Sequence, residues 1–229
     1  MATIALPEPI AITTGPATVA ELLENLGVPA CRVRLYPPLG HATEHDAAES
    51  KNLHGAICEL VDGTLVEKPM GFYESHLGHI LAFFIESYLT HHRLGFVVGE
   101  SGASRTIPGR VRMPDVGFYS WNHFPGRTLP AGGVLDVPAD LVVEILSPSN
   151  TRTEMEQKRQ EYFASGTRLY WEVLPETRQV RVFTDANTHT LLGETDSLVG
   201  EPVLPGFVLS IQEWFSRAGN RPVATPPEA

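Results

Sequence analysis

A short apolar run limits the possible folds of this 229-residue chain more than any other feature of its sequence. After Asp140 the chain reads Leu-Val-Val-Glu-Ile-Leu to Leu146, with the single charge of Glu144 inside the run. A continuous apolar run of this length is typical of a strand that is buried on both faces. Because side chains alternate along a strand, Glu144 shares one face with Val142 and Leu146. The run therefore predicts a central strand in a covered sheet.

Two helices and several shorter strands are predicted around this run. Residues 73–92 carry apolar residues at helical spacing, and Thr151 with Glu154 has the capping-box spacing that starts a helix over 151–165. Asp62-Gly63 predicts a hairpin turn, and residues 36–54 are expected to be a loop with one helical turn. Other elements are expected at 18–26 and 211–215 as helices, and at 96–98, 104–107, 111–120, 168–174 and 179–184 as strands. The order predicts an α/β fold, a mixed sheet flanked by helices.

The composition fits a globular protein of one large domain, or of one domain with an appendage: 42% of the residues are hydrophobic and 19% are charged. We expect a main domain over 51–216, an N-terminal extension with a short helix over 1–50, and a Pro-rich tail over 217–229. The N-terminus has no signal-peptide pattern and no apolar stretch is long enough to cross a membrane, so a cytoplasmic location is expected. Cys31 and Cys58 match no metal-binding spacing and are expected to be ordinary thiols.

The formal net charge of −10 argues against a protein that coats nucleic acid through bulk charge. This net charge does not exclude a local basic surface that contacts nucleic acid. Residues 101–127 hold Arg105, Arg110 and Arg112 with a single acid, and Arg152 lies near the start of the second helix. Arginines grouped around a site would contact phosphates. The alternative is that these arginines are scattered over a solvated surface.

Two carboxylates stand where the pattern calls for apolar residues. Glu144 would be costly to bury unless it is paired or binds a metal, and the alternative is an edge strand with one wet face. Asp115 follows Pro114, which cannot donate to a sheet ladder and so indicates a bulge or a strand edge that would aim the carboxylate out of the pleat. The alternative for Asp115 is a solvated strand or turn position.

Two helical charges lie on buried stripes. Lys158 is three residues after Met155 and four before Tyr162, so it points toward the sheet that contains Glu144. The alternative is an exposed pair with Glu154. Glu74 lies in the first turn of the helix over 73–92, on its apolar stripe, although an acidic residue is also favourable at any helix N-terminus.

Together these four residues have a coherent chemistry. Carboxylates are the oxygen ligands that suit Mg²⁺ or Mn²⁺, and such an ion can lower the pKa of bound water and stabilise charge on a phosphate. A lysine beside it can orient the water and offset charge on the phosphorus. Asp115, Glu144 and Glu74 are therefore candidate metal ligands, and Lys158 is a candidate catalytic lysine for phosphodiester hydrolysis.

The sequence resembles the PD-(D/E)XK nuclease superfamily through Pro114-Asp115 and the strand glutamate Glu144. More closely, it resembles the Uma-two (Uma2) branch of restriction-endonuclease-like proteins. The quoted motifs are 59–63, 113–116, 140–149, Lys158 with Tyr162, and Tyr170-Trp171. The resemblance covers about residues 55–185 and implies a restriction-endonuclease-like core in which Asp115 and Glu144 bind metal. One departure is Leu146, which stands where the superfamily has a lysine; Lys158 could reach the same space from the next helix.

The leading hypothesis is a Mg²⁺- or Mn²⁺-dependent DNA endonuclease, expected to act as a homodimer because cutting both strands needs two sites. One alternative is a protein that keeps the nuclease fold and binds nucleic acid or another partner without cleaving. A second alternative is a metal-dependent hydrolase of a small phosphorylated substrate, which predicts a closed pocket.

Overall fold

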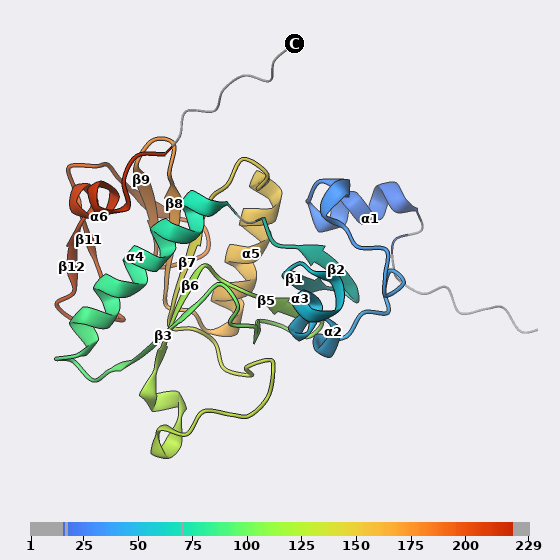
Figure 1. Cartoon of the computed structure of the whole chain (residues 1–229), viewed down its shortest axis with the longest axis horizontal. Helices are drawn as coiled ribbons and strands as arrows, with labels where there is room; N and C mark the ends of the chain where they lie inside the picture. The colour runs from blue at the N-terminus through green and yellow to red at the C-terminus, as the bar shows by residue number, and fades with distance from the viewer. Residues whose placement is uncertain (1–15, 17, 70, 222–229) are drawn as a thin grey trace, which may run out of the picture.

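The computed structural model describes residues 16, 18–69 and 71–221, and its largest element is a six-stranded sheet (Figure 1). The strand order is β10-β9-β8-β7-β6-β3. The β7–β8 pair is parallel and the other pairs are antiparallel. The strands are β3 (Gly95–Gly99), β6 (Val116–Ser120), β7 (Leu141–Ile145), β8 (Leu169–Leu174), β9 (Gln179–Phe183) and β10 (His189–Leu192). The apolar run thus forms an interior strand, buried along its whole length, as predicted.

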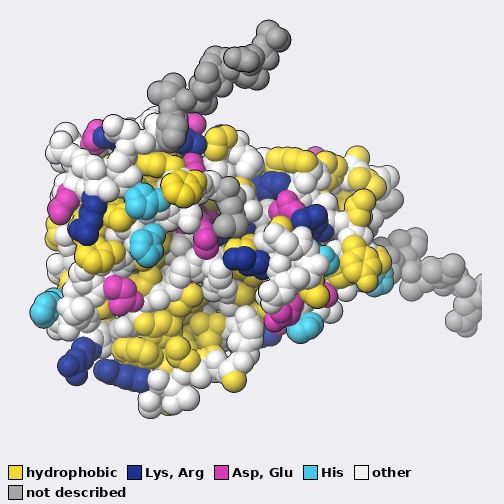
Figure 2. Space-filling view, viewed as in Figure 1, with side chains coloured by type: hydrophobic (Ala, Val, Ile, Leu, Met, Phe, Trp, Pro, Cys, Tyr) yellow, Lys and Arg dark blue, Asp and Glu magenta, His cyan; other side chains and the backbone are white. Residues whose placement is uncertain are grey.

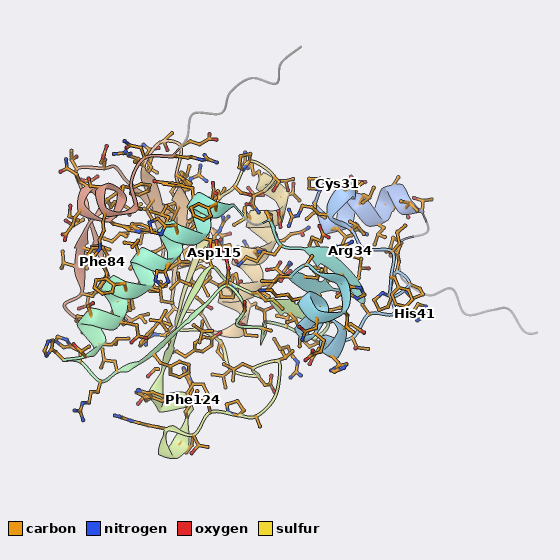
Figure 3. All side chains as sticks on the ribbon, viewed as in Figure 1. Cys31, Arg34, His41, Phe84, Asp115 and Phe124 are labelled. Carbon is orange, nitrogen blue, oxygen red and sulfur yellow. The ribbon has the colours of Figure 1, made fainter. Side chains whose placement is uncertain are left out.

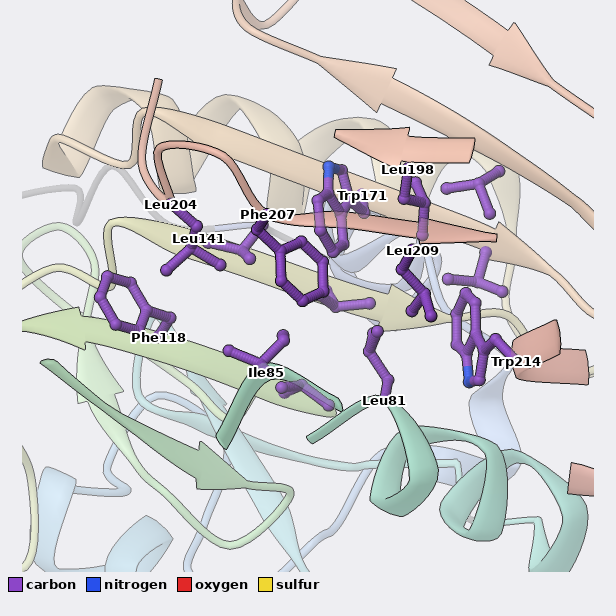
Figure 4. Close-up of a cluster of buried hydrophobic side chains, with 14 of the residues drawn as sticks. Leu81, Ile85, Phe118, Leu141, Trp171, Leu198, Leu204, Phe207, Leu209 and Trp214 are labelled. Atoms are coloured by element: carbon purple, nitrogen blue, oxygen red, sulfur yellow. The ribbon is translucent and has the colours of Figure 1, made fainter. Parts of the chain in front are cut away.

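Helices cover both faces of this sheet. On one face lie α4 (Phe72–Leu89) and α6 (Ile211–Ala218), with the ribbon of β11 (Ser197–Val199) and β12 (Val208–Ser210) beside them. Figure 4 shows the main core between these layers, where Leu81 and Ile85 of α4 meet Leu141 and Trp171. On the other face, Tyr162 of α5 (Arg152–Ser165) packs in a second cluster with residues of β7 and β8. The mixed sheet flanked by helices is the fold that the sequence predicted.

A smaller four-stranded sheet, of order β2-β1-β5-β4, lies beside the large one. Its strands are β1 (Cys58–Val61), β2 (Thr64–Glu67), β4 (Ser104–Arg105) and β5 (Arg110–Arg112). Asp62 and Gly63 have φ values of 47° and 73°, the left-handed conformation of a two-residue hairpin turn, as expected. The predicted single strand over 111–120 is wrong, because the chain leaves β5 at Met113 and enters β6 of the other sheet at Val116. Pro114 lies in that break and cannot donate to either ladder.

The N-terminal segment packs against α5. It contains α1 (Val19–Leu26), a single 3₁₀ turn (Ala30–Arg32), α2 (Glu44–Ala48) and α3 (Ser50–His54). The last two helices correct the expectation of a loop with one helical turn over 36–54. Thr43 caps α2 in a capping box with Asp46, a signal that the Pro-rich start of this stretch obscured. The Arg32 guanidinium forms a bidentate ion pair with the Glu154 carboxylate of α5, with N–O distances of 2.8 and 2.7 Å.

Helices α1 and α5 start at the predicted caps, whereas the helix predicted over 73–92 ends earlier, at Leu89. The Thr18 and Thr151 hydroxyls accept hydrogen bonds from the Glu21 and Glu154 amides, and α1 ends at Gly27 in the left-handed region. Within the described residues, no helix is long and apolar enough to span a membrane. Residues 1–15 and 222–229, which are the start of the predicted N-terminal extension and most of the predicted Pro-rich tail, lie outside the described part of the chain.

Candidate active site

Asp115 lies at the junction of the two sheets, immediately before β6 (Figure 3). The antiparallel register pairs Val116 of β6 with Val143 of β7. Asp115, the residue before Val116, therefore lies opposite Glu144, the residue after Val143. The Ile145 amide donates a 2.6 Å hydrogen bond to Asp115 Oδ2. The other carboxylate oxygen, Oδ1, lies 2.8 Å from Nζ of Lys68. The structure therefore brings together the two carboxylates that the sequence singled out.

Glu144 faces α5 and is 4% exposed. The Tyr162 hydroxyl donates a 2.9 Å hydrogen bond to Oε1 of Glu144, and Lys158 Nζ lies 3.3 and 3.4 Å from the two carboxylate oxygens. Burial raises the pKa of Glu144; Lys158 opposes this shift, the negative charge of Asp115 adds to it, and the resulting pKa is about 7. Glu144 is thus a buried carboxylate that its neighbours neutralise only in part.

Lys158 points inward, as its place on the helical stripe predicted, and is 1% exposed. Its nearest partner is Glu59 of β1, whose Oε1 lies 2.8 Å from Nζ. Burial opposes ionisation of Glu59, but the charges of Lys158 and Arg112 outweigh it and lower its pKa to about 2. The Lys158 ammonium therefore lies closer to Glu59 than to Glu144. The alternative pairing with Glu154 does not form, because Glu154 binds Arg32.

Glu74 and Asp115 line the same cavity, which has a volume of about 540 Å³. Glu74 lies in the first turn of α4, is 9% exposed, and forms a 2.8 Å ion pair with Arg221. The glutamate oxygen in this ion pair is the buried Oε1. The lining also includes Glu86 and Glu100, and it contains no lysine or arginine among the described residues. The cavity beside Asp115 is therefore acidic.

The four arginines of the predicted nucleic-acid surface are all paired with acids. Arg105 bonds Glu44 and Asp136, Arg110 bonds Asp62 and Glu161, Arg112 bonds Glu59 and Glu161, and Arg152 bonds Glu156. Arg112 is only 3% exposed, so its guanidinium is part of the interior. The side chain of Arg152 is 92% exposed. On the face that Figure 2 shows, basic and acidic side chains are intermingled.

Asp115, Glu144 and Glu74 are the candidate ligands of a divalent cation. Among the described residues, no group of three or more His, Cys, Asp or Glu side chains is arranged to hold a metal. Mg²⁺, however, usually takes only one or two protein carboxylates and completes its shell with water and substrate phosphate. Asp115 with Glu144 supplies two such carboxylates, and Glu74, whose Oε1 is paired with Arg221, places a third carboxylate in the adjoining cavity. These residues fit Mg²⁺ or Mn²⁺ in their chemistry.

Sequence reasoning assigned no role of their own to two charged residues that contact this site. Glu59 is a charged residue inside the apolar run of β1, which is the same signal that identified Glu144. In the sequence it contributed only to the family motif over 59–63. Lys68 follows β2 and precedes a proline, and nothing local indicates that it is buried. Its partner, Asp115, is 47 residues away in the chain, so only the three-dimensional arrangement identifies it.

Comparisons with known proteins agree with this fold. A solved structure, described as a putative nuclease belonging to DUF820 from Anabaena variabilis, matches with a TM-score of 0.63 and 22% identity, over 72% of this chain and 92% of that one. No curated protein matches the chain. The model of the Uma2 family, described as "Putative restriction endonuclease", matches residues 45–212. Since this match covers well over half of the sequence, the chain belongs to the Uma2 family.

Proposed function

We propose that this protein is a Mg²⁺- or Mn²⁺-dependent endonuclease that hydrolyses phosphodiester bonds of DNA. The observation that carries the proposal is the meeting of Asp115 and Glu144 at the junction of the two sheets, beside a cavity that Glu74 also lines. The family description and the nuclease-like fold support the same class of reaction. The nuclease domain is assigned to residues 51–216.

In this proposal, Asp115, Glu144 and Glu74 would hold the cation. The bound cation would supply a water of lowered pKa and positive charge for the phosphate. Lys158 keeps Glu144 in place and offsets part of the negative charge of the carboxylate group. Tyr162 fixes the orientation of Glu144 through its hydroxyl. Arg152, which is exposed, and Arg105 and Arg110, which are partly exposed, are the proposed phosphate contacts. Arg112 is buried and paired with Glu59 and Glu161, so we assign it a structural role instead of a phosphate contact.

The test is a plasmid-nicking assay with Mg²⁺, Mn²⁺ or EDTA. The variants Asp115→Asn and Glu144→Gln keep the shape of each side chain and remove its charge. Glu24→Gln is the matched control, because this exposed glutamate lies on α1 and belongs to neither the proposed metal site nor the proposed phosphate contacts. We expect metal-dependent nicking that falls by about 100-fold or more in the two site variants and is unchanged in the control. Equal activity in all four proteins would contradict the site.

A second candidate function is nucleic-acid binding without cleavage. The observation that favours it is that both lysines of the site, Lys68 and Lys158, are already paired with carboxylates. This candidate predicts that a DNA mobility shift persists in EDTA and that no metal ion produces nicks. Nicking by the wild type that stops with EDTA excludes it.

We also propose that two copies act together on duplex DNA, since two scissile phosphates need two sites. Sedimentation of the free protein and of its DNA complex tests this directly. A dimer in the complex is expected, together with linear as well as nicked plasmid. A monomer in both states, with nicked product only, contradicts it.

A further inference from the structure

Lys68 is a buried cation directly against the proposed metal-binding carboxylate. Its side chain is 3% exposed, and its Nζ lies 2.8 Å from Asp115 Oδ1. The same nitrogen donates a 2.6 Å hydrogen bond to the Met113 carbonyl oxygen. Among the described residues, Lys68 is the only ion-pair partner of Asp115. A second polar group therefore holds the ammonium in place, independently of the carboxylate.

The position of Lys68 conflicts with a cation on the same carboxylate. Asp115 Oδ2 already accepts the Ile145 amide, so Oδ1 is the less constrained oxygen, and Lys68 contacts it. An ammonium and a divalent cation that share one oxygen repel each other, and this repulsion is strong where water is scarce. Either the Lys68 ammonium moves away from Asp115 or the divalent cation does not bind there.

The surroundings indicate which group moves. The cavity next to Asp115 is lined by Glu74, Glu86 and Glu100 and by no lysine or arginine among the described residues. Such a lining attracts a divalent cation to the side of Asp115 that faces solvent. Lys68 can keep its hydrogen bond to the Met113 carbonyl when it leaves Asp115, and its side chain has four rotatable bonds through which the ammonium can move away from Oδ1.

We propose that Lys68 is a positioning residue that acts as the resident counter-cation of Asp115: its ammonium neutralises this carboxylate in the metal-free protein, and a divalent cation must displace it to bind. The inference rests on the proposed function in one respect, that the ion binds at Asp115. Its consequence is that Lys68 weakens metal binding while keeping the empty site from carrying unpaired buried charge.

The first test is a Mn²⁺ titration of the full chain, followed by the electron paramagnetic resonance signal of free Mn²⁺. Lys68→Met removes the charge and keeps the length of the side chain. We expect the Kd of this variant to be about tenfold lower than that of the wild type. Lys51→Met, at an exposed lysine of α3, is the matched control and should leave the Kd unchanged. A merely structural role for Lys68 would leave affinity equal or weaken it, and that result overturns the inference.

The second test follows the response of Lys68 itself in the wild-type protein, and variants serve only for assignment and as a control. In a spectrum of protein labelled with ¹³C at the lysine side chains, Mg²⁺ should shift the ε-methylene resonance of Lys68, assigned by its loss in Lys68→Arg. The shift should be absent in Asp115→Asn. Mg²⁺ binding without any shift of this resonance overturns the proposal.

The two proposals fail in different ways. If the wild type cleaves with metal but Lys68→Met does not bind Mn²⁺ more tightly, the role of Lys68 is wrong and the nuclease assignment stands. If the wild type neither cleaves nor binds Mn²⁺, both are wrong. If it binds Mn²⁺ more tightly on loss of Lys68 yet never cleaves, the counter-cation stands and the nuclease assignment falls.

Discussion

Lys158 and Glu59 form a 2.8 Å ion pair in which each side chain is 1% exposed. The lysine comes from α5, which covers the large sheet, and the glutamate from β1 of the small sheet. Arg112 and Glu161 extend the same buried network. The Arg112 guanidinium lies 2.9 Å from the Glu59 carboxylate and 2.7 Å from the Glu161 carboxylate. These charges join the two sheets next to the candidate site, so the position of Glu144 depends on both.

Loss of Arg112 should destabilise the protein strongly. Arg112→Met leaves Glu59 and Glu161 short of a buried partner, and removing one member of a buried pair typically costs about 3–5 kcal/mol. The free energy of unfolding in urea measures this. Arg152→Ala is the control, because this exposed arginine has only its Glu156 pair, and its unfolding midpoint should stay at the wild-type value. An Arg112→Met midpoint as high as that of the wild type would contradict the buried network.

Tyr162→Phe should weaken the hold on Glu144 and leave the fold intact. The hydroxyl donates the 2.9 Å hydrogen bond to Glu144 Oε1, and a hydrogen bond to an ionisable group contributes about 1.5–3 kcal/mol. We expect the free energy of unfolding to fall by an amount in this range. Phe163→Leu, a change at the neighbouring position on α5, controls for altered packing. No loss of stability in Tyr162→Phe would mean that Glu144 does not need this donor.

The contribution of the Arg32–Glu154 pair to stability should disappear in acid. Burial opposes ionisation of Glu154, but the hydrogen bonds from Arg32 and the charge of Lys158 outweigh it, so the pKa of Glu154 is lowered. A lowered folded-state pKa gives stability that is fully present above the unfolded value of about 4.3 and is lost as the pH falls through the folded pKa. The difference in unfolding free energy between wild type and Glu154→Gln should be large at pH 7 and shrink below about pH 4. A difference that grows as the pH falls would contradict the pairing.

Gly71→Ala should move Glu74 without straining the backbone. Gly71 has a φ of −111°, which any residue adopts, but a Cβ there would overlap Oε2 of Glu74. Because the overlapping atom is the end of a flexible side chain, stability should change by no more than about 1 kcal/mol. The affinity for Mn²⁺ should fall if Glu74 is a ligand. Gly99→Ala provides a comparison, since a Cβ at that glycine meets no atom within 4 Å. Unchanged affinity in Gly71→Ala would remove Glu74 from the ligand set.

The sequence predicted the parts of the site that have a local signal. Glu144 interrupts an apolar run and Lys158 lies on an apolar helical stripe, so local patterning was enough to identify both. Arg112 carries no such signal: it stands in a basic stretch, and its burial depends on Glu59 and Glu161, which are 53 and 49 residues away. The break between β5 and β6 was signalled by Pro114, but its consequence, a change from one sheet to the other, depends on pairing with distant strands.

The central claim is that Asp115 and Glu144 share a divalent cation. Crystals grown with Mn²⁺ test this most directly, because the anomalous scattering of manganese locates the ion without reference to activity. We expect one strong anomalous peak at about 2.1 Å from a carboxylate oxygen of each residue, with the Lys68 ammonium displaced from Asp115. Manganese bound elsewhere, with the Lys68–Asp115 pair intact, would contradict the account.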